Sequence, residues 1–200
     1  MSKIKFCGMR SAKDIESANE IKPEYVGFVF WDKSKRYITK EQAVELRKML
    51  DKDIKAVGVF LDETEETICR ISESNAIDII QLHGHEDEIF INSIREKTGK
   101  PVIKAFVIRS EEDLKEAERS SADMILLDSG TGSGKTFDHE LLKDFKRPFF
   151  LAGGMSCENV GSLIEEFDPY CVDVSSGIET DGIKDKDKMT EFAKKVRREI

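Results

Sequence analysis

A cysteine and an aspartate stand where two short apolar runs of this sequence end. Cys7 closes the run Ile4–Cys7 and is followed by Gly8, and Asp128 directly follows Met124–Leu127. Parallel α/β folds carry their catalytic groups at such strand ends. A partly desolvated carboxyl has a raised pKa, which suits a general acid. The alternatives are a small buried cysteine and an aspartate that caps a loop or helix.

Arg36 and two histidines follow two other apolar runs. Arg36 lies in the segment Trp31–Tyr37, which holds three cations and two aromatic residues. Its guanidinium can bind a planar carboxylate through two parallel hydrogen bonds, although a solvated charged loop has the same composition. His83 and His85 have the spacing of a metal-binding pair, but no third ligand is near them in the sequence. A hydrogen-bonded histidine at the rim of the fold is the alternative.

Small residues follow the last two apolar runs of the chain. They are Gly153 and Gly154 after the first run, and Ser175, Ser176 and Gly177 after the second. In eight-stranded α/β barrels, the loops after strands seven and eight often bind phosphate with the N-terminus of a short helix. Tight turns at a crowded rim would use the same residues. The sequence therefore predicts a phosphate site here and leaves the turn interpretation open.

The glycine-rich segment Gly130–Thr136 is similar to a nucleotide-binding P-loop. That motif needs a glycine five residues before Gly134, where Ser129 stands. We therefore expect a glycine-rich lid near the site. A nucleotide cradle that uses Lys135 is the alternative.

Apolar runs alternate with helical patterns along the whole chain. The expected strands are Ile4–Cys7, Tyr25–Phe30, Ala56–Phe60, Ile77–Leu82, Val102–Val107, Met124–Leu127, Phe149–Ala152 and Cys171–Val174. The expected helices are Ser11–Asn19, Lys40–Leu50, Thr64–Ser74, Glu86–Lys97, Glu111–Arg119, His139–Phe145, Cys157–Phe167 and Lys186–Arg198. Thr39 with Gln42, Ser110, Asp138 and Ser156 are expected helix caps. Eight such units without a linker predict a single-domain (β/α)8 barrel, the TIM-barrel architecture, over residues 1–200. An open doubly wound sheet is the competing topology.

Charge and cysteine content exclude several classes of protein. The formal net charge of −8 argues against a nucleic-acid or anionic-membrane surface. The four cysteines form no CxxC pair, so neither a disulfide framework nor a zinc site is predicted. No targeting pattern or membrane-spanning run is present, and we expect a cytoplasmic protein.

Short motifs from end to end of the chain resemble one enzyme family, the phosphoribosylanthranilate isomerases of tryptophan biosynthesis. The motifs, in the family's order, are Lys5-Phe6-Cys7-Gly8-Met9, Tyr25-Val26-Gly27-Phe28-Val29-Phe30, Ser34-Lys35-Arg36-Tyr37-Ile38, Val57-Gly58-Val59-Phe60, Gln81-Leu82-His83-Gly84, Leu126-Leu127-Asp128-Ser129, Gly134-Lys135-Thr136-Phe137-Asp138, Leu151-Ala152-Gly153-Gly154-Met155 and Val172-Asp173-Val174-Ser175-Ser176-Gly177-Ile178-Glu179. Each motif is weak alone, and the ordered set is specific.

The resemblance implies a (β/α)8 barrel and an Amadori rearrangement of N-(5-phosphoribosyl)anthranilate, without cofactor or metal. Cys7 matches the family's general base and Asp128 its general acid. Arg36 matches the residue that holds the anthranilate carboxylate, and the residues after strands seven and eight match the phosphate loops. His83 joins the substrate-binding candidates. The implied partner is a small phosphosugar, without nucleic acid or membrane, and the oligomeric state is either monomer or homodimer.

The chain departs from the family pattern in places that spare these groups. The loop after Asp128 is short, His139 stands where tryptophan is usual, Phe6 replaces isoleucine and Lys35 replaces proline. A related phosphosugar enzyme that forms an indole is a further alternative. It would need a catalytic lysine, for which Lys104 is the candidate because it interrupts an apolar strand.

Overall fold

The structure is a computed structural model that describes residues 1–129, 142 and 145–198. The predicted loop Gly130–Thr136 lies outside the described residues. So does most of the predicted helix His139–Phe145, including its expected cap Asp138.

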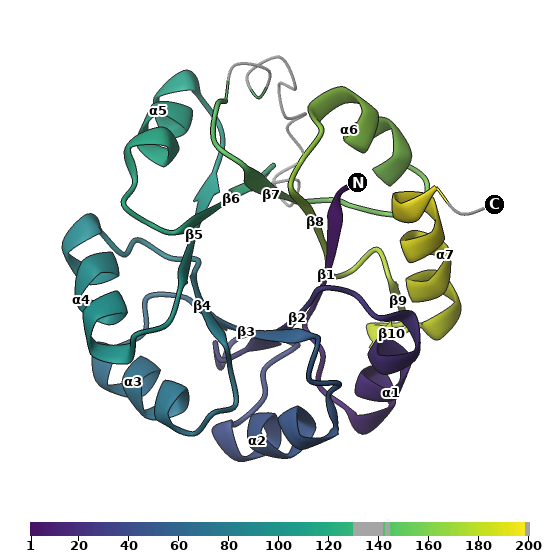
Figure 1. Cartoon of the computed structure of the whole chain (residues 1–200), viewed down its shortest axis with the longest axis horizontal. Helices are drawn as coiled ribbons and strands as arrows, with labels where there is room; N and C mark the ends of the chain where they lie inside the picture. Colours follow the sequence, from purple (N-terminus) through teal and green to yellow (C-terminus); the bar gives the residue numbers. More distant parts are fainter. Residues whose placement is uncertain (130–141, 143–144, 199–200) are drawn as a thin grey trace.

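The apolar runs form a closed ring of eight parallel strands (Figure 1). The strands are β1 (Lys3–Cys7), β2 (Tyr25–Val29), β3 (Lys55–Phe60), β4 (Ile79–Leu82), β5 (Val102–Val107), β6 (Met124–Asp128), β7 (Phe149–Ala152) and β8 (Cys171–Val174). The ring closes where β1 pairs with β8, with Lys5 opposite Asp173. The closed ring confirms the predicted barrel and excludes the open sheet.

Helices cover the outside of the ring wherever the connections between strands are described (Figure 1). In the described residues these are α1 (Ala12–Ile21), α2 (Lys40–Met49), α3 (Glu65–Glu73), α4 (Glu88–Thr98), α5 (Glu111–Arg119), α6 (Val160–Phe167) and α7 (Lys186–Arg197). The capping box of Thr39 with Gln42 is confirmed at α2, and Ser110 caps α5. These side chains accept hydrogen bonds from backbone N–H groups that the first helical turn leaves unpaired.

Two features differ from the predicted elements. The helix expected from Cys157 begins at Val160, and its N-cap is Asn159 rather than Ser156. The Asn159 side chain instead accepts a hydrogen bond from the backbone N–H of Ser156, which places Ser156 in a turn before the helix. In addition, a short hairpin of β9 (Glu179–Thr180) and β10 (Ile183–Lys184) follows β8.

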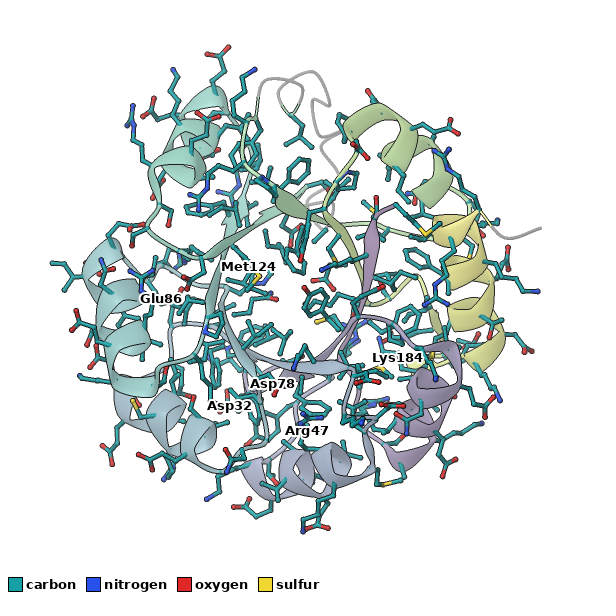
Figure 2. The ribbon with its side chains drawn as sticks, viewed as in Figure 1. Asp32, Arg47, Asp78, Glu86, Met124 and Lys184 are labelled. Carbon is teal, nitrogen blue, oxygen red and sulfur yellow. The ribbon has the colours of Figure 1, made fainter. Side chains whose placement is uncertain are left out.

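Side-chain alternation along the strands divides the apolar residues into two cores. The inner core fills the ring and consists of Tyr25, Val57, Ile79, Ile103, Ala105, Leu126, Phe150, Ala152 and Cys171, with Met124 packed against it (Figure 2). The larger outer core lies between strands and helices. Successive strand residues point to opposite faces, so Asp128 shares the inward face with Leu126, and Asp173 shares it with Cys171. Lys104, between Ile103 and Ala105, points outward.

Candidate active site

Cys7 ends β1 at the carboxyl-terminal mouth of the barrel and is half-buried. The chain turns directly after it, with Gly8 at a φ of +80° that suits glycine. A Cβ built on Gly27 of the neighbouring strand would lie 2.8 Å from the Cys7 sulfur. Gly27 is therefore needed to leave room for the thiol.

Charged residues in the barrel interior surround Cys7. Lys5 Nζ lies 2.6 Å from Asp173 Oδ2, and their side chains are 0% and 6% exposed. Burial raises the pKa of the Cys7 thiol above its usual value, whereas the positive charges of Lys5 and Lys184 act in the opposite direction. Asp173 raises the same pKa. The protonation state of the Cys7 thiol thus depends on the balance between desolvation, which favours the neutral thiol, and the nearby cations, which favour the thiolate.

Arg36 reaches the mouth from the β2–α2 loop and is held by Glu179 of the hairpin. Its Nε and Nη2 atoms each donate to a different Glu179 carboxylate oxygen at 2.7 Å. Lys184 Nζ also lies 2.7 Å from Glu179 and donates to the Ser175 carbonyl at 2.9 Å. Burial opposes the ionisation of Glu179, but the hydrogen bonds from Arg36 and Lys184 outweigh it and lower its pKa to about 2. The hairpin therefore fixes the direction of the Arg36 guanidinium.

Asp128 ends β6, three positions around the ring from β1, and meets a histidine and a glycine. His83 Nε2 lies 3.4 Å from Asp128 Oδ2, and both side chains are partly exposed. His83 Nδ1 lies 2.9 Å from the amide nitrogen of Gln81. Gly153 has a φ of +93°, and a Cβ built on it would lie 2.6 Å from Asp128 Oδ1. The first predicted phosphate loop therefore packs against the predicted acid.

The predicted phosphate loops after β7 and β8 lie side by side. A parallel bridge joins Ser156 to Gly177, and a Cβ on Gly177 would lie 1.9 Å from the Met155 carbonyl oxygen. Ser175 donates a hydrogen bond to the carbonyl of Cys7 at 3.1 Å, which ties the second loop to β1. The expected short helix is replaced after β8 by the β9–β10 hairpin.

The second histidine and the outward lysine lie away from the mouth. His85 is 95% exposed, and its Nδ1 lies 3.0 Å from Asp62 Oδ2. Lys104 donates to the Gly84 carbonyl at 2.6 Å and to Glu86 at 2.7 Å. Figure 2 shows Glu86 outside the ring of strands. Lys104 thus braces the loop that carries His83, and this geometry does not favour the role of a catalytic lysine. Among the described residues, no group of three His, Cys, Asp or Glu side chains is placed to hold a metal ion.

Five polar residues at the mouth were not singled out as site candidates from the sequence: Lys5, Gln81, Asp173, Glu179 and Lys184. Two sequence signals mark them. Lys5, Gln81 and Asp173 interrupt apolar strands at inward positions, each two residues before a candidate at or just after the end of the same strand. The pair Asp181-Gly182 is a hairpin-turn signal, and a hairpin around it places Lys184 opposite Glu179.

The arrangement combines proton-transfer groups, a fixed guanidinium and two adjoining glycine-containing loops at one end of a parallel barrel. Barrel enzymes carry out their chemistry at this end. The fold and the site therefore define a (β/α)8-barrel enzyme. None of the helices in the described part of the chain combines the length and apolar character that a bilayer crossing requires.

Comparison with known proteins identifies the family. Residues 4–195 match the model of the N-(5'-phosphoribosyl)anthranilate isomerase family. The isomerase of Endomicrobium trichonymphae is 43% identical over 98% of this chain and 99% of its own length. The chain belongs to this family, and its activity is the isomerisation of N-(5'-phosphoribosyl)anthranilate, a step of tryptophan biosynthesis.

Solved structures of the family have the same fold. A phosphoribosylanthranilate isomerase in complex with reduced 1-(o-carboxyphenylamino)-1-deoxyribulose 5-phosphate has a TM-score of 0.89 and 36% identity, covering 99% of this chain and 100% of that one. A structure of monomers derived from the dimeric isomerase of Thermotoga maritima has a TM-score of 0.88 and 37% identity, with the same coverage.

Proposed function

We propose that residues 1–200 form one catalytic domain in which Asp128 is the general acid and Cys7 the general base of an Amadori rearrangement. The observation that carries this proposal is the placement of both side chains on the inward face of strands that end at the same mouth. Proton transfer by positioned groups of this kind contributes about 10²–10⁴-fold each.

The reaction needs the two groups in sequence. Asp128 gives a proton to the furanose ring oxygen, the bond from that oxygen to C1 breaks, and the nitrogen lone pair forms a C1=N iminium. The Cys7 thiolate then takes the proton from C2. The electron pair of that C–H bond forms C1=C2, and the C=N pair returns to nitrogen. Loss of the C2 hydroxyl proton and uptake of a proton at C1 give the ketone, so the product is an isomer of the substrate.

The remaining candidates bind the two ends of the substrate. Arg36, directed by Glu179, holds the anthranilate carboxylate through charge-assisted hydrogen bonds. Gly153 and Gly154 present backbone to the phosphate together with the segment after β8, namely Ser175, Ser176 and Gly177. His83 lies beside Asp128 and faces the sugar. We further propose a cytoplasmic enzyme that acts on this phosphosugar without nucleic-acid or membrane partners. The homodimer is the assembly to test first, because the Thermotoga maritima relative is dimeric.

The test is the loss of phosphoribosylanthranilate fluorescence catalysed by the purified chain. We expect Cys7→Ala and Asp128→Asn each to lower turnover about 10²–10⁴-fold, with unchanged thermal unfolding curves. Cys69→Ala, on α3 away from the mouth, is the matched control and should keep full turnover. Full activity in either site variant would refute the assigned roles.

A further inference from the structure

One hydrogen bond and one longer polar contact link the barrel interior to Asp128 through His83. Gln81 is buried in β4, where it pairs with Val59 on one side and Ile103 on the other. Its amide nitrogen lies 2.9 Å from His83 Nδ1. The other imidazole nitrogen, His83 Nε2, lies 3.4 Å from Asp128 Oδ2. Each imidazole nitrogen therefore lies close to one polar side chain, Nδ1 to Gln81 and Nε2 to Asp128.

The amide nitrogen of glutamine can only donate, so His83 Nδ1 must accept. A neutral imidazole that accepts at Nδ1 carries its proton on Nε2, which here faces Asp128. A second proton on Nδ1 would point at the N–H of Gln81, so this contact disfavours the imidazolium. His83 is then a neutral donor to the carboxylate.

The reverse orientation of the amide is less favourable. The Gln81 carbonyl oxygen is buried and has no hydrogen-bond partner among the described residues. If the Gln81 amide were reversed, its oxygen would accept a hydrogen bond from a protonated His83 Nδ1. Its NH₂ group would then lie in the buried position that has no hydrogen-bond partner. An unpaired buried carbonyl oxygen occurs more often than unpaired buried N–H groups. The contact as observed is therefore the better one.

The backbone of His83 is held in place independently of Gln81. Its N–H donates to the Phe60 carbonyl at 2.8 Å. The next residue, Gly84, donates its N–H to Glu86 at 2.9 Å and accepts from Lys104 at 2.6 Å. Because the loop is fixed by these contacts, replacing Gln81 should change the protonation of the imidazole more than its position.

We propose that Gln81 is a positioning residue that keeps His83 as the neutral Nε2–H tautomer, which donates to Asp128 as that residue releases its proton to the substrate. The proposal rests on the acid role of Asp128. Donation to the carboxylate stabilises the negative charge that develops during ring opening, and a fixed neutral imidazole does so without competing for the proton. A hydrogen bond that strengthens as charge develops raises kcat rather than lowering KM.

The first measurement is nitrogen NMR of ¹⁵N-histidine-labelled protein. The chain has three histidines, and His83→Asn and His85→Asn assign their signals. We expect the neutral His83 at pH 8 to show an unprotonated Nδ1 and a protonated Nε2. A protonated Nδ1 in the wild type, alone or in an imidazolium, would overturn the proposal. This readout needs no turnover, so it is separate from the test of Asp128.

The second measurement compares two substitutions of the amide. In Gln81→Glu the carboxylate accepts a proton from Nδ1, so His83 should become an imidazolium, and kcat should fall about 10–100-fold with little change in KM. We expect this loss of kcat to be smaller than that caused by removing an oxyanion-hole donor, because the 3.4 Å separation of His83 Nε2 and Asp128 Oδ2 is longer than an ordinary hydrogen bond. Gln81→Met keeps the size of the side chain but fixes no tautomer, and we expect a smaller loss and mixed tautomer signals.

His85→Asn is the matched control, because it removes an imidazole from the same loop that faces solvent and Asp62. It should leave kcat, KM and the His83 signals unchanged. An unchanged kcat and pH profile in Gln81→Glu would overturn the positioning role even if Asp128→Asn is inactive. If Asp128→Asn is fully active, the acid assignment fails instead, whatever the NMR spectra show.

Discussion

The described contacts of the two proposed catalytic groups at the barrel mouth differ in charge. Around Cys7, the strands β1 and β8 and the hairpin supply Lys5, Asp173, Lys184 and Glu179. Beside Asp128, the described contacts include the imidazole of His83, which directly follows β4 and which we propose to be neutral, and, behind it, the amide of Gln81. A buried thiol must ionise to act as a base, and nearby cations favour its anion. A carboxyl that must hold a proton and then release it is better served by neutral donors.

The difference has a structural basis in the closure of the barrel. Lys5 and Asp173 are 168 residues apart in sequence and meet only because β1 pairs with β8. Gln81 lies on β4 and His83 directly follows that strand, so the two need no long-range pairing to meet. The charged side of the mouth, around Cys7, therefore exists only in the closed ring, and removing a charge there should disturb stability and chemistry together.

Lys5→Met should have the largest effect, because it removes a buried cation and leaves Asp173 unpaired in the barrel interior. Breaking a buried ion pair from one side costs about 3–5 kcal/mol of stability. Since Lys5 lowers the pKa of Cys7, its loss should also move the rising limb of kcat/KM to higher pH. Urea unfolding and the pH profile measure the two effects separately.

Adding Asp173→Leu to Lys5→Met sharpens this test. The double variant buries no unpaired charge, so most of the lost stability should return. Asp173 raises the pKa of Cys7, and its removal should reverse only part of the shift, because Lys5 has the larger effect. A pH profile equal to that of the wild type in both variants would mean that the charged pair is structural and does not tune the thiol.

Gly153→Ala should have the next largest effect, on the Asp128 side of the mouth. The added Cβ would lie 2.6 Å from Asp128 Oδ1 and 2.2 Å from Ser129 Oγ, in a backbone conformation with a φ of +93°. We expect turnover to fall at least about tenfold, because small displacements of a catalytic group are costly, and stability to fall by about 1–3 kcal/mol. Steady-state kinetics and thermal unfolding check both effects.

The control for this substitution is Gly161→Ala on α6. A Cβ there meets no atom within 4 Å, and alanine is favoured over glycine in a helix by about 0.5–1 kcal/mol. This variant should be slightly more stable and fully active. Equal losses in the two alanine variants would show that the Gly153 effect is not local to Asp128.

Most of the fold could be predicted from the sequence because its signals are local. β5, β7 and β8 have the predicted bounds, and the caps Thr39 and Ser110 depend on residues within one helical turn. The start of α6 was missed because Ser156 and Asn159 can both cap a helix, and only the turn geometry decides between them.

The candidate site was less predictable because its residues act in pairs from distant strands. Strand alternation distinguishes Lys104, which points outward, from Lys5, which points inward, once one inward residue of each strand is known. The partners of Lys5 and Arg36 lie more than 140 residues away in sequence and become neighbours only in the closed barrel. The hairpin that carries Glu179 and Lys184 had its own signal in Asp181-Gly182, with both residues at positive φ.

Glu179→Gln should have the smallest effect on turnover, and its effect on stability should depend on pH. The folded pKa of Glu179 is about 2, below its usual 4.5, so the carboxylate stabilises the fold above about pH 5 and loses this contribution as the pH falls toward 2. We expect the wild type to be about 2–3 kcal/mol more stable than Glu179→Gln at pH 7, and this difference to decrease steadily below pH 5. KM should rise, because glutamine cannot hold the Arg36 guanidinium through two charged contacts.

Glu45→Gln is the control for the acid-dependent difference. Glu45 forms an exposed pair with Lys48 on α2, and such surface pairs contribute about 0–1 kcal/mol. Its unfolding free energy should follow that of the wild type at every pH. If Glu179→Gln also followed the wild type from pH 7 to pH 3, the hairpin carboxylate would not be held by its cations. The charged side of the mouth would then have to depend on Lys5 and Asp173 alone.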